Sequence, residues 1–149
     1  MLPSPNGATL SQFAAGFTRV VLAGCLRNAT AVARALHTFG GTVAVIAAGE
    51  RWVQAEELTG SLRPAVEDLV AAGAILAALG AARPSPEAEV AIAALRAAAL
   101  DPARFLAGCA SGRELHERGL AQDVDLAAQV DVSQAVPYLV DGAYRAWNG

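Results

Sequence analysis

The sequence is poor in several residue types, and each shortage excludes a class of protein. Aromatic residues make up only 5% of the 149 residues, so large rings cannot build most of the core. Charged residues account for 17% and the formal net charge is −3, and no basic patch of the kind that nucleic-acid-binding proteins need is present. The hydrophobic fraction of 54% is rich in alanine and predicts a packed core of closely approaching helices.

Cysteine and histidine are also scarce, with two residues of each. Cys25 and Cys109 are far apart in apolar surroundings, which favours buried free thiols in a reducing compartment over a disulfide framework. Two histidines without close cysteine or histidine partners do not make a zinc site, and no Ser-His-Asp arrangement is detectable. Met1–Gly7 has neither the basic segment nor the apolar run of a signal peptide, so we expect a cytoplasmic protein.

No hydrophobic run is long enough for a membrane span. The most apolar stretch, Leu69–Ala82, is flanked by Glu67, Asp68 and Arg83, and it is shorter than the roughly 20 apolar residues that a bilayer requires. We therefore expect a buried helix here and no membrane partner.

Two apolar segments enclose a helical pattern in the first half of the chain. Arg19–Ala23 and Thr42–Ala47 are rich in β-branched and aliphatic residues, as buried strands are. Between them, Ala29–Phe39 has helical spacing, with Asn28 as candidate N-cap and the pair Gly40-Gly41 as the stop. This order predicts an α/β fold, three-layer-like, with a mostly parallel sheet and helices on both of its faces.

A second half rich in helices is expected to follow, within one domain that spans residues 1–149. Val66–Leu79 has a strong helical pattern that Gly80 ends, and Ser85-Pro86-Glu87 is a typical helix start. Arg51–Pro64 is expected to be a loop that can include a short helix. The remaining expected elements are helices at Asp101–Gly108, from a capping box at Ser111 to about Gly119, and at Ala121–Ala127, with extended segments at Val130–Val132 and Val136–Val140.

Three stretches are expected to form a binding site at one edge of this sheet. In open parallel α/β sheets, ligands bind beyond the carboxyl ends of the strands, which would bring together Ser4–Gly7, Gly24–Asn28 and Ala48–Glu50. Each stretch offers backbone N–H groups at or near a helix start, an arrangement that suits phosphate or another anion. The side-chain amides of Asn6 and Asn28 add neutral donors.

Each of these features also has a purely structural interpretation, which the sequence leaves open. Asn6-Gly7 is more often a plain turn than a phosphate loop, and Asn28 is first of all an N-cap. Glu67 and Asp68 open the long apolar helix, where acids complement the helix dipole. In the functional alternative, one of the two binds Mg²⁺, because hard cations take carboxylate oxygens. Ser111 is expected to be a cap, because no histidine is placed to activate it.

Several short motifs follow one another along the chain, and their order and spacing are informative together. The early ones are Ser4-Pro5-Asn6-Gly7-Ala8-Thr9, Ala23–Ala29, Ala47-Ala48-Gly49-Glu50 and Glu67–Gly73. The later ones are Ser111-Gly112, Leu115, Gly119, Asp123, Asp131-Val132-Ser133 and Val136-Pro137. In order and spacing, these motifs resemble the 2-phosphosulfolactate phosphatase family over nearly the whole chain.

The resemblance implies Mg²⁺-dependent hydrolysis of the phosphate ester of 2-phosphosulfolactate, or of a related small phosphorylated acid. The products would be sulfolactate and phosphate, in a step that leads to coenzyme M. Such a reaction needs neutralisation of the phosphoryl charge and a positioned water. The implied catalytic residues are Asn6, Asn28, Glu67 and Asp68, the implied phosphate-binding residues are Ser4, Asn6, Gly7, Asn28 and Gly49, and the implied Mg²⁺ ligands are Glu67 and Asp68.

Two features depart from the family pattern. The family's earlier segment, with an Asp-Val-Leu-Arg-Ala-Thr-Thr-like motif, has no counterpart here, and only Met1–Pro3 precede the loop at Ser4. We therefore expect the chain to be the C-terminal portion of a larger phosphatase-like domain. Arg51–Pro64 is also longer than the family's usual connection at this place.

Two other functions stay open beside the phosphatase. One is a catalytically inactive remnant that binds an anion or serves as an oligomerisation module, with a homodimer as the expected assembly, because an exposed sheet edge favours association. The other is a Rossmann-like nucleotide-binding module, which the lack of a Gly-x-Gly-x-x-Gly loop disfavours.

Overall fold

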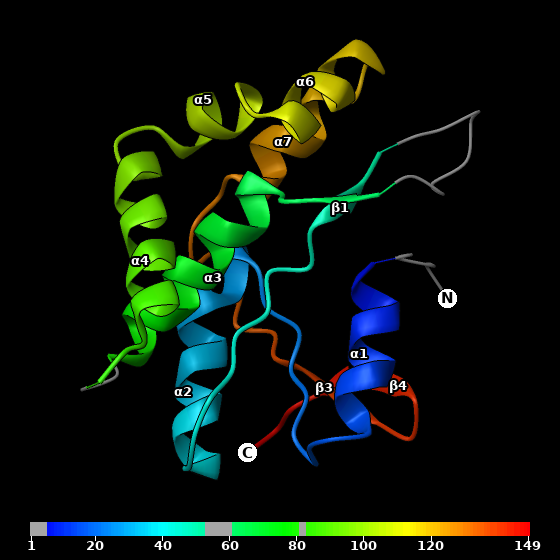
Figure 1. Cartoon of the computed structure of the whole chain (residues 1–149), viewed down its shortest axis with the longest axis vertical. Helices are drawn as coiled ribbons and strands as arrows, with labels where there is room; N and C mark the ends of the chain where they lie inside the picture. Colours follow the sequence, from blue (N-terminus) through cyan, green and yellow to red (C-terminus); the bar gives the residue numbers. More distant parts are fainter. Residues whose placement is uncertain (1–5, 53–60, 81–82) are drawn as a thin grey trace.

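The fold is built mainly of helices (Figure 1), and the computed structural model describes residues 6–52, 61–80 and 83–149. The helices are α1 (Gly7–Ala15), η1 (Leu26–Asn28), α2 (Ala29–Phe39), α3 (Val66–Leu79), α4 (Pro86–Ala98), α5 (Pro102–Ala107), α6 (Ala110–Glu117) and α7 (Ala121–Ala127). The strands form two antiparallel pairs, β1 (Glu50–Arg51) with β2 (Leu62–Arg63), and β3 (Pro137–Val140) with β4 (Ala143–Ala146). Within the described ranges, no helix has the length and hydropathy that a membrane span requires.

Helix α3 is the central element, because it packs against both α2 and α4. The contact with α4 is very close: a Cβ added at Gly73 would collide with the backbone carbonyl oxygen of Ala91. Most of the buried hydrophobic residues are alanines, with a few valines and leucines and one isoleucine among them. The prediction of a core of closely approaching helices with few aromatic rings is therefore confirmed.

Local signals set most helix ends as predicted. Helices α2 and α3 have the expected bounds, and Gly80 closes α3 in a left-handed conformation with φ of 60°, which glycine adopts without a steric penalty. At the start of α4, Ser85 Oγ accepts a hydrogen bond from the Ala88 N–H at 3.3 Å. At the start of α5, Asp101 Oδ1 accepts one from the Arg104 N–H at 3.0 Å.

Two predictions that involve the cysteines are wrong: the helix cap at Ser111 and the burial of both thiols. Helix α6 begins at Ala110, so Ser111 lies inside it and the predicted capping box at Ser111 is wrong. Cys109 takes the N-cap position instead, and its Sγ accepts a hydrogen bond from the Gly112 N–H at 3.4 Å. Both thiols are free, as predicted, but Cys25 is exposed and Cys109 only half-buried, because each lies at the start of a helix rather than within the helical core.

The parallel sheet expected from the sequence is not formed by the described residues. Segment 20–23 instead lies antiparallel to β3: the Ala23 N–H donates to the Pro137 carbonyl at 3.0 Å, and the Leu139 N–H donates to the Val21 carbonyl at 2.9 Å. For Thr42–Ala47, no backbone hydrogen bond occurs within the described part of the chain. The apolar pattern marked two segments that the structure leaves outside helices, Arg19–Ala23 and Thr42–Ala47. A strand also needs a neighbour with matching backbone groups, and the pattern does not provide one. The fold is mixed α and β, with helices predominating.

A hairpin at the end of the chain gathers several of the few aromatic residues. Val136–Val140 was expected to be extended and contains β3, whereas Val130–Val132 lies outside the strands. The turn Asp141-Gly142 has positive φ at both residues, 50° and 75°, as two-residue hairpin turns require. Next to this hairpin, the Trp147 ring packs 4.7 Å from the Phe39 ring of α2 and 5.5 Å from the ring of Tyr138.

The close contact of α3 with α4 predicts that Gly73→Ala destabilises the fold. The added methyl group would push against the Ala91 carbonyl, which belongs to rigid backbone, so we expect a loss of about 1–3 kcal/mol in the free energy of unfolding. Gly108→Ala is the control, because its Cβ would meet nothing nearer than carbonyl oxygens at 3.5 Å. Urea denaturation of both variants tests this, and equal stability of the two would contradict the packing described above.

Candidate functional site

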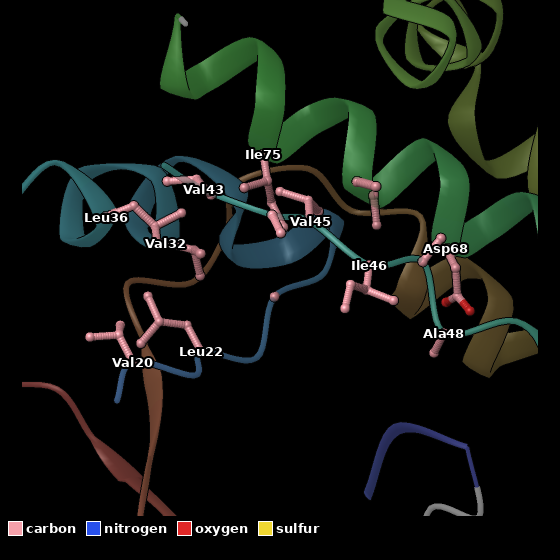
Figure 2. A pocket seen from close by; sticks show the side chains of 15 residues that line it. Val20, Leu22, Val32, Leu36, Val43, Val45, Ile46, Ala48, Asp68 and Ile75 are labelled. Atoms are coloured by element: carbon pink, nitrogen blue, oxygen red, sulfur yellow. The ribbon is translucent and has the colours of Figure 1, made fainter. Parts of the chain in front are cut away.

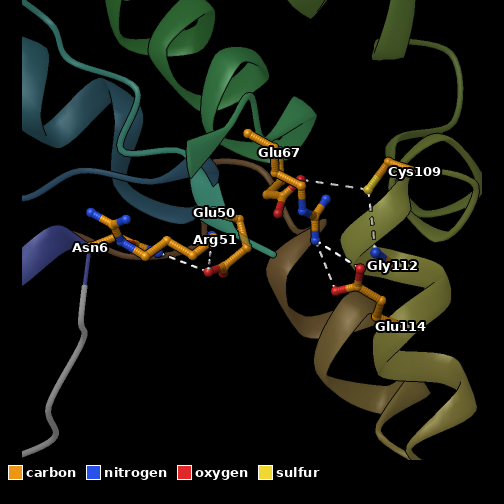
Figure 3. A network of polar contacts seen from close by, with 8 residues as sticks. Asn6, Glu50, Arg51, Glu67, Cys109, Gly112 and Glu114 are labelled. Atoms are coloured by element: carbon orange, nitrogen blue, oxygen red, sulfur yellow. Dashed lines mark hydrogen bonds and ion pairs between the residues drawn. The ribbon is translucent and has the colours of Figure 1, made fainter. Parts of the chain in front are cut away.

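Polar side chains from distant parts of the sequence meet near the starts of α1 and α3 (Figure 3). Asn6 is the N-cap residue of α1, but its side chain is turned to the β1 strand, where Asn6 Nδ2 donates to Glu50 Oε1 at 2.8 Å. The same carboxylate oxygen accepts a hydrogen bond from the Arg51 N–H at 2.8 Å. Two of the three stretches expected to form the site, those at residues 4–7 and 48–50, are thus in contact through Asn6 and Glu50.

Asp68 fixes the turn before β1 to the start of α3. Asp68 Oδ2 accepts a hydrogen bond from the Gly49 N–H at 2.8 Å. Gly49 has φ of 74°, and a Cβ at this position would lie 2.9 Å from the Arg63 carbonyl oxygen. The turn therefore requires glycine for its conformation and for its close approach to β2.

Three carboxylates share this region, and two of them, Glu67 and Glu50, act on the third, Asp68. Burial is the main cause that raises the pKa of Asp68 above its usual 3.8, and the neighbouring charges of Glu67 and Glu50 raise it further. The Gly49 N–H acts in the opposite direction, because it stabilises the ionised form. The site is therefore a locus of concentrated negative charge at the start of a helix.

The two adjacent acids of α3 point to different places. Successive residues of a helix are rotated by about 100°, so Glu67 and Asp68 cannot face the same way. Asp68 lines a cavity of about 200 Å³ (Figure 2). Glu67 lines a separate cavity of about 50 Å³, where Glu67 Oε2 accepts a hydrogen bond from the Cys109 thiol at 3.6 Å. Burial and the charge of Glu67 raise the pKa of that thiol, which keeps it protonated and able to donate.

The fit of this site to Mg²⁺ depends on how many ligands the protein must provide. In the part of the chain that the structure describes, no group of three or more His, Cys, Asp or Glu residues could hold a metal ion. Mg²⁺, however, is usually bound through one or two carboxylates, with waters and substrate phosphate oxygens completing the octahedron. Asp68 and Glu50 are hard oxygen donors of this kind, and the charge of Glu50 contributes to the raised pKa of Asp68.

The Asn28 side chain joins two backbone segments by hydrogen bonds, residues 23–25 and the segment at Ala135. Its side chain is buried, with 6% exposure. Asn28 Oδ1 accepts a hydrogen bond from the Cys25 N–H at 2.8 Å, and Asn28 Nδ2 donates to the carbonyls of Ala135 at 2.9 Å and Ala23 at 3.4 Å. Its N-cap position in α2 is confirmed, although the side chain bonds to these backbone groups instead of capping the helix.

The remaining residues expected at the site stay predictions. Contact of Asn28 with an anion is one of them, as are the phosphate-binding roles of Gly7 and Gly49. Ser4 lies outside the described residues.

The structure adds an ion pair between a buried arginine and a half-buried glutamate, which no local pattern of the sequence indicates. Arg63 in β2 is only 6% exposed, and its Nη2 donates to both carboxylate oxygens of Glu114, at 2.9 and 3.0 Å. Its guanidinium group also lies 4.7 Å from the centroid of the Trp52 ring. The pair joins the β1–β2 ladder to α6, next to Glu67 and Cys109 (Figure 3).

This ion pair predicts that Glu114→Gln weakens the fold. The substitution leaves the buried Arg63 charge without its anionic partner, and we expect a loss of about 1–2 kcal/mol, moderated because the Glu114 side chain is 37% exposed. Glu117→Gln, on the exposed side of the same helix, should change stability little. Chemical denaturation at low and high salt measures both variants, and an unchanged midpoint for Glu114→Gln would refute a stabilising role of the pair.

The raised pKa of Asp68 predicts a pH-dependent effect of Asp68→Asn. An acid whose pKa is higher in the folded state stabilises the fold fully below its unfolded value, near 3.8, and this stability is lost as pH rises through the folded value. Asparagine stays neutral and keeps an oxygen for the Gly49 N–H. The variant should therefore melt at a higher temperature than the parent at pH 7, with the difference disappearing towards pH 4.

Asp125→Asn, which removes an exposed carboxylate of α7, controls for the general effect of one lost negative charge. Melting curves between pH 4 and 8 in a metal-free buffer provide the measurement. If Asp68→Asn were less stable than the parent at pH 7, the burial and charge repulsion at Asp68 would not be net destabilising.

Comparison with known proteins identifies the family. The sequence model of the 2-phosphosulpholactate phosphatase family matches residues 1–142. A probable 2-phosphosulfolactate phosphatase of Deinococcus radiodurans is 34% identical over 146 residues, which cover 95% of this chain and 56% of the relative. A protein of the same name from Thermus thermophilus is 34% identical over 143 residues, covering 93% and 56%. The chain spans little more than half the length of these relatives, and it belongs to the 2-phosphosulfolactate phosphatase family.

Proposed function

We propose that the chain is part of a Mg²⁺-dependent phosphatase for a small phosphorylated acid. The substrate would be 2-phosphosulfolactate or a related phosphate monoester, and the products the free hydroxy acid and inorganic phosphate. Membership in the family supports the reaction class, and the names of the two relatives support the substrate. The observation that carries the proposal is the meeting of Asn6, Gly49-Glu50 and Asp68 at the starts of two helices.

The charge of this cluster explains why a cation would be needed. Glu50 and Glu67 are near enough to Asp68 to raise its pKa, so a phosphate monoester, which is itself an anion, would be repelled from the same region. A bound Mg²⁺ would neutralise carboxylates and phosphate oxygens together and stabilise the charge of the transferring phosphoryl group. Asp68 is our first choice as ligand, with Glu50 beside it. Glu67, the other expected ligand, accepts a hydrogen bond from Cys109 and would support the site from one side.

Asn6 and Gly7 would orient the phosphate. The Asn6 amide carries two N–H groups, of which one donates to Glu50, and the second can donate to a phosphate oxygen. The first turn of α1 contains no acidic residue, so the partial positive charge of the helix N-terminus is not neutralised within its own first turn. Glu50 could in addition accept a hydrogen bond from the attacking water and hold it in line with the phosphorus.

A non-catalytic role is the second candidate, because part of the structure favours association. Ile46 is 63% exposed, and the backbone around it has no hydrogen-bond partner within the described ranges. Such a surface suits a module that binds an anion at the Asn6–Glu50 cluster and otherwise assembles with another chain. The homodimer expected from the sequence belongs to this alternative.

Phosphate release distinguishes the two candidates. The assay would use 2-phosphosulfolactate and a panel of small phosphate monoesters, with Mg²⁺ or with a chelator. It would be run on this chain and on this chain joined to the unmatched portion of the D. radiodurans relative. For the phosphatase we expect turnover that the chelator abolishes, and in Asp68→Asn a decrease of about 100-fold or more, because a group that holds the neutralising charge is lost.

Asp125→Asn should retain full activity in the same assay. As a readout independent of turnover, Mg²⁺ should raise the melting temperature of the parent but not that of Asp68→Asn. Folded protein that releases no phosphate from any ester in either form would overturn the phosphatase proposal and leave the non-catalytic role.

A further inference from the structure

Two extended segments run in the same direction with an open space between them. Segments 20–24 and 43–48 lie between α1 on one side and α2 and α3 on the other (Figures 1 and 2). A cavity of about 200 Å³ opens on the side of α2 and α3, and one of about 290 Å³ on the side of α1. The residues that line both cavities are Val20, Leu22, Gly24, Ala44, Ile46 and Ala48. We call the space between the two segments the slot.

Backbone N–H and C=O groups face the slot from both of its edges, as they would beside a β-strand. Val21 and Ala23 use their backbone groups to pair with β3, on the edge away from the slot. Successive residues of an extended chain direct their backbone groups to opposite edges, so those of Leu22 and Gly24 face inward. Across the slot, residues 43–48 find no backbone partner in the part of the chain described, and no hydrogen bond joins the two segments. Backbone groups in folded proteins are almost always paired when they are removed from water.

Apolar side chains form much of the walls above and below the slot, and the polar lining residues are Asp68 in one cavity and Ser11, Thr18 and Tyr144 in the other. Val32, Val45 and Ile75 line it on the side of α2 and α3 (Figure 2), and Leu10 and Ile46 line it on the side of α1. A central strand of a parallel sheet needs this environment, because it is covered by helices on both faces and carries apolar side chains on both.

The position of α1 sets the direction of a strand in the slot. The contact between Asn6 and Glu50 places the start of α1 at the carboxyl end of segment 43–48. A strand parallel to both segments would therefore end beside Asn6, and a right-handed connection would place α1 over one face of the sheet, where α1 lies (Figure 1).

We propose that the slot binds an extended polypeptide strand with apolar side chains on both faces, parallel to segments 20–24 and 43–48. The occupant is a strand from the portion of the family's chain that lies outside the matched residues. The match covers 56% of each relative, so more than two fifths of each relative is available to provide it. Only a peptide presents N–H and C=O groups at the spacing that both edges require.

Hydrogen exchange of the intact chain tests this binding. Synthetic peptides of about ten residues, covering the unmatched portion of the D. radiodurans relative, would be added one at a time. One peptide should slow amide exchange by about tenfold or more at Leu22, at Gly24 and at alternate residues of segment 43–48 together. Because a strand in the slot bonds on both edges, N-methylation of that peptide at odd or at even positions should abolish the protection in either case.

Substitutions at two residues of nearly equal exposure test whether the peptide binds in the slot. Ile46→Glu puts a charge on the wall of the slot, and it should weaken binding of the active peptide by about tenfold or more. Val90→Glu is the control, because Val90 in α4 has almost the same exposure, 62% against 63% for Ile46, and lies outside both cavities. This variant should bind the peptide as the parent does.

Three results would overturn the proposal. The first is that no peptide protects both segments. The second is that N-methylation abolishes the protection at only one of the two sets of alternate positions. A strand that pairs along one edge alone, outside the slot, would behave in this way. The third is protection that increases with protein concentration in the absence of peptide, since a second copy of the chain would then be the occupant. The readout is independent of phosphate release, so failure of the phosphatase proposal leaves the result interpretable.

Discussion

The close packing of α3 between α2 and α4 is the constraint on which the rest of the structure depends. Alanine and glycine at these contacts let the helix backbones approach until a methyl group at Gly73 has no room. A core of this kind gains its stability from many short-range contacts rather than from a few large rings. It also leaves α3 little freedom to rotate or slide, because either movement would bring larger side chains into the contact with Ala91.

A fixed α3 determines where the charges of the site lie. Its first turn carries Glu67 and Asp68, which diverge because they are adjacent in a helix. Asp68 holds the turn at Gly49, and that turn carries Glu50, which in turn holds Asn6 at the start of α1. The negative cluster is therefore connected to the helical core through a chain of short hydrogen bonds, and its geometry follows from how the apolar part of α3 packs.

The sequence predicted those elements whose signals are local. Helices α2 and α3 were predicted with their bounds, since caps and glycine stops act within one turn of the helix. The Asp141-Gly142 turn is also a local signal, typical of a two-residue hairpin, and β4 could have been predicted from it. Cys109 took the cap position expected for Ser111, because a thiol can accept the same backbone hydrogen bond.

What the sequence could not predict are partners that are distant along the chain. The pattern at Arg19–Ala23 indicates a buried strand, but nothing in it indicates β3 as the neighbour. The same holds for the site: the motifs identified Asn6 and Asp68 as polar residues at helix starts, while the contact of Asn6 with Glu50 and the use of Asn28 to bind the Ala135 carbonyl depend on the tertiary fold. Arg63 was overlooked because its partner, Glu114, lies in another element.

One end of the slot adjoins the negative cluster, because Gly49 and Glu50 directly follow segment 43–48, and this proximity has a thermodynamic consequence. A strand that pairs with residues 43–48 would fix the backbone that leads into Gly49 and Glu50, and so would order the ligands of a cation at Asp68. If strand binding orders the cluster in this way, linkage requires that a bound cation strengthens strand binding by the same factor. Strand binding at residues 43–48 and cation binding at the cluster are then two parts of one cooperative equilibrium, because each partner lowers the cost of ordering the turn that both of them need.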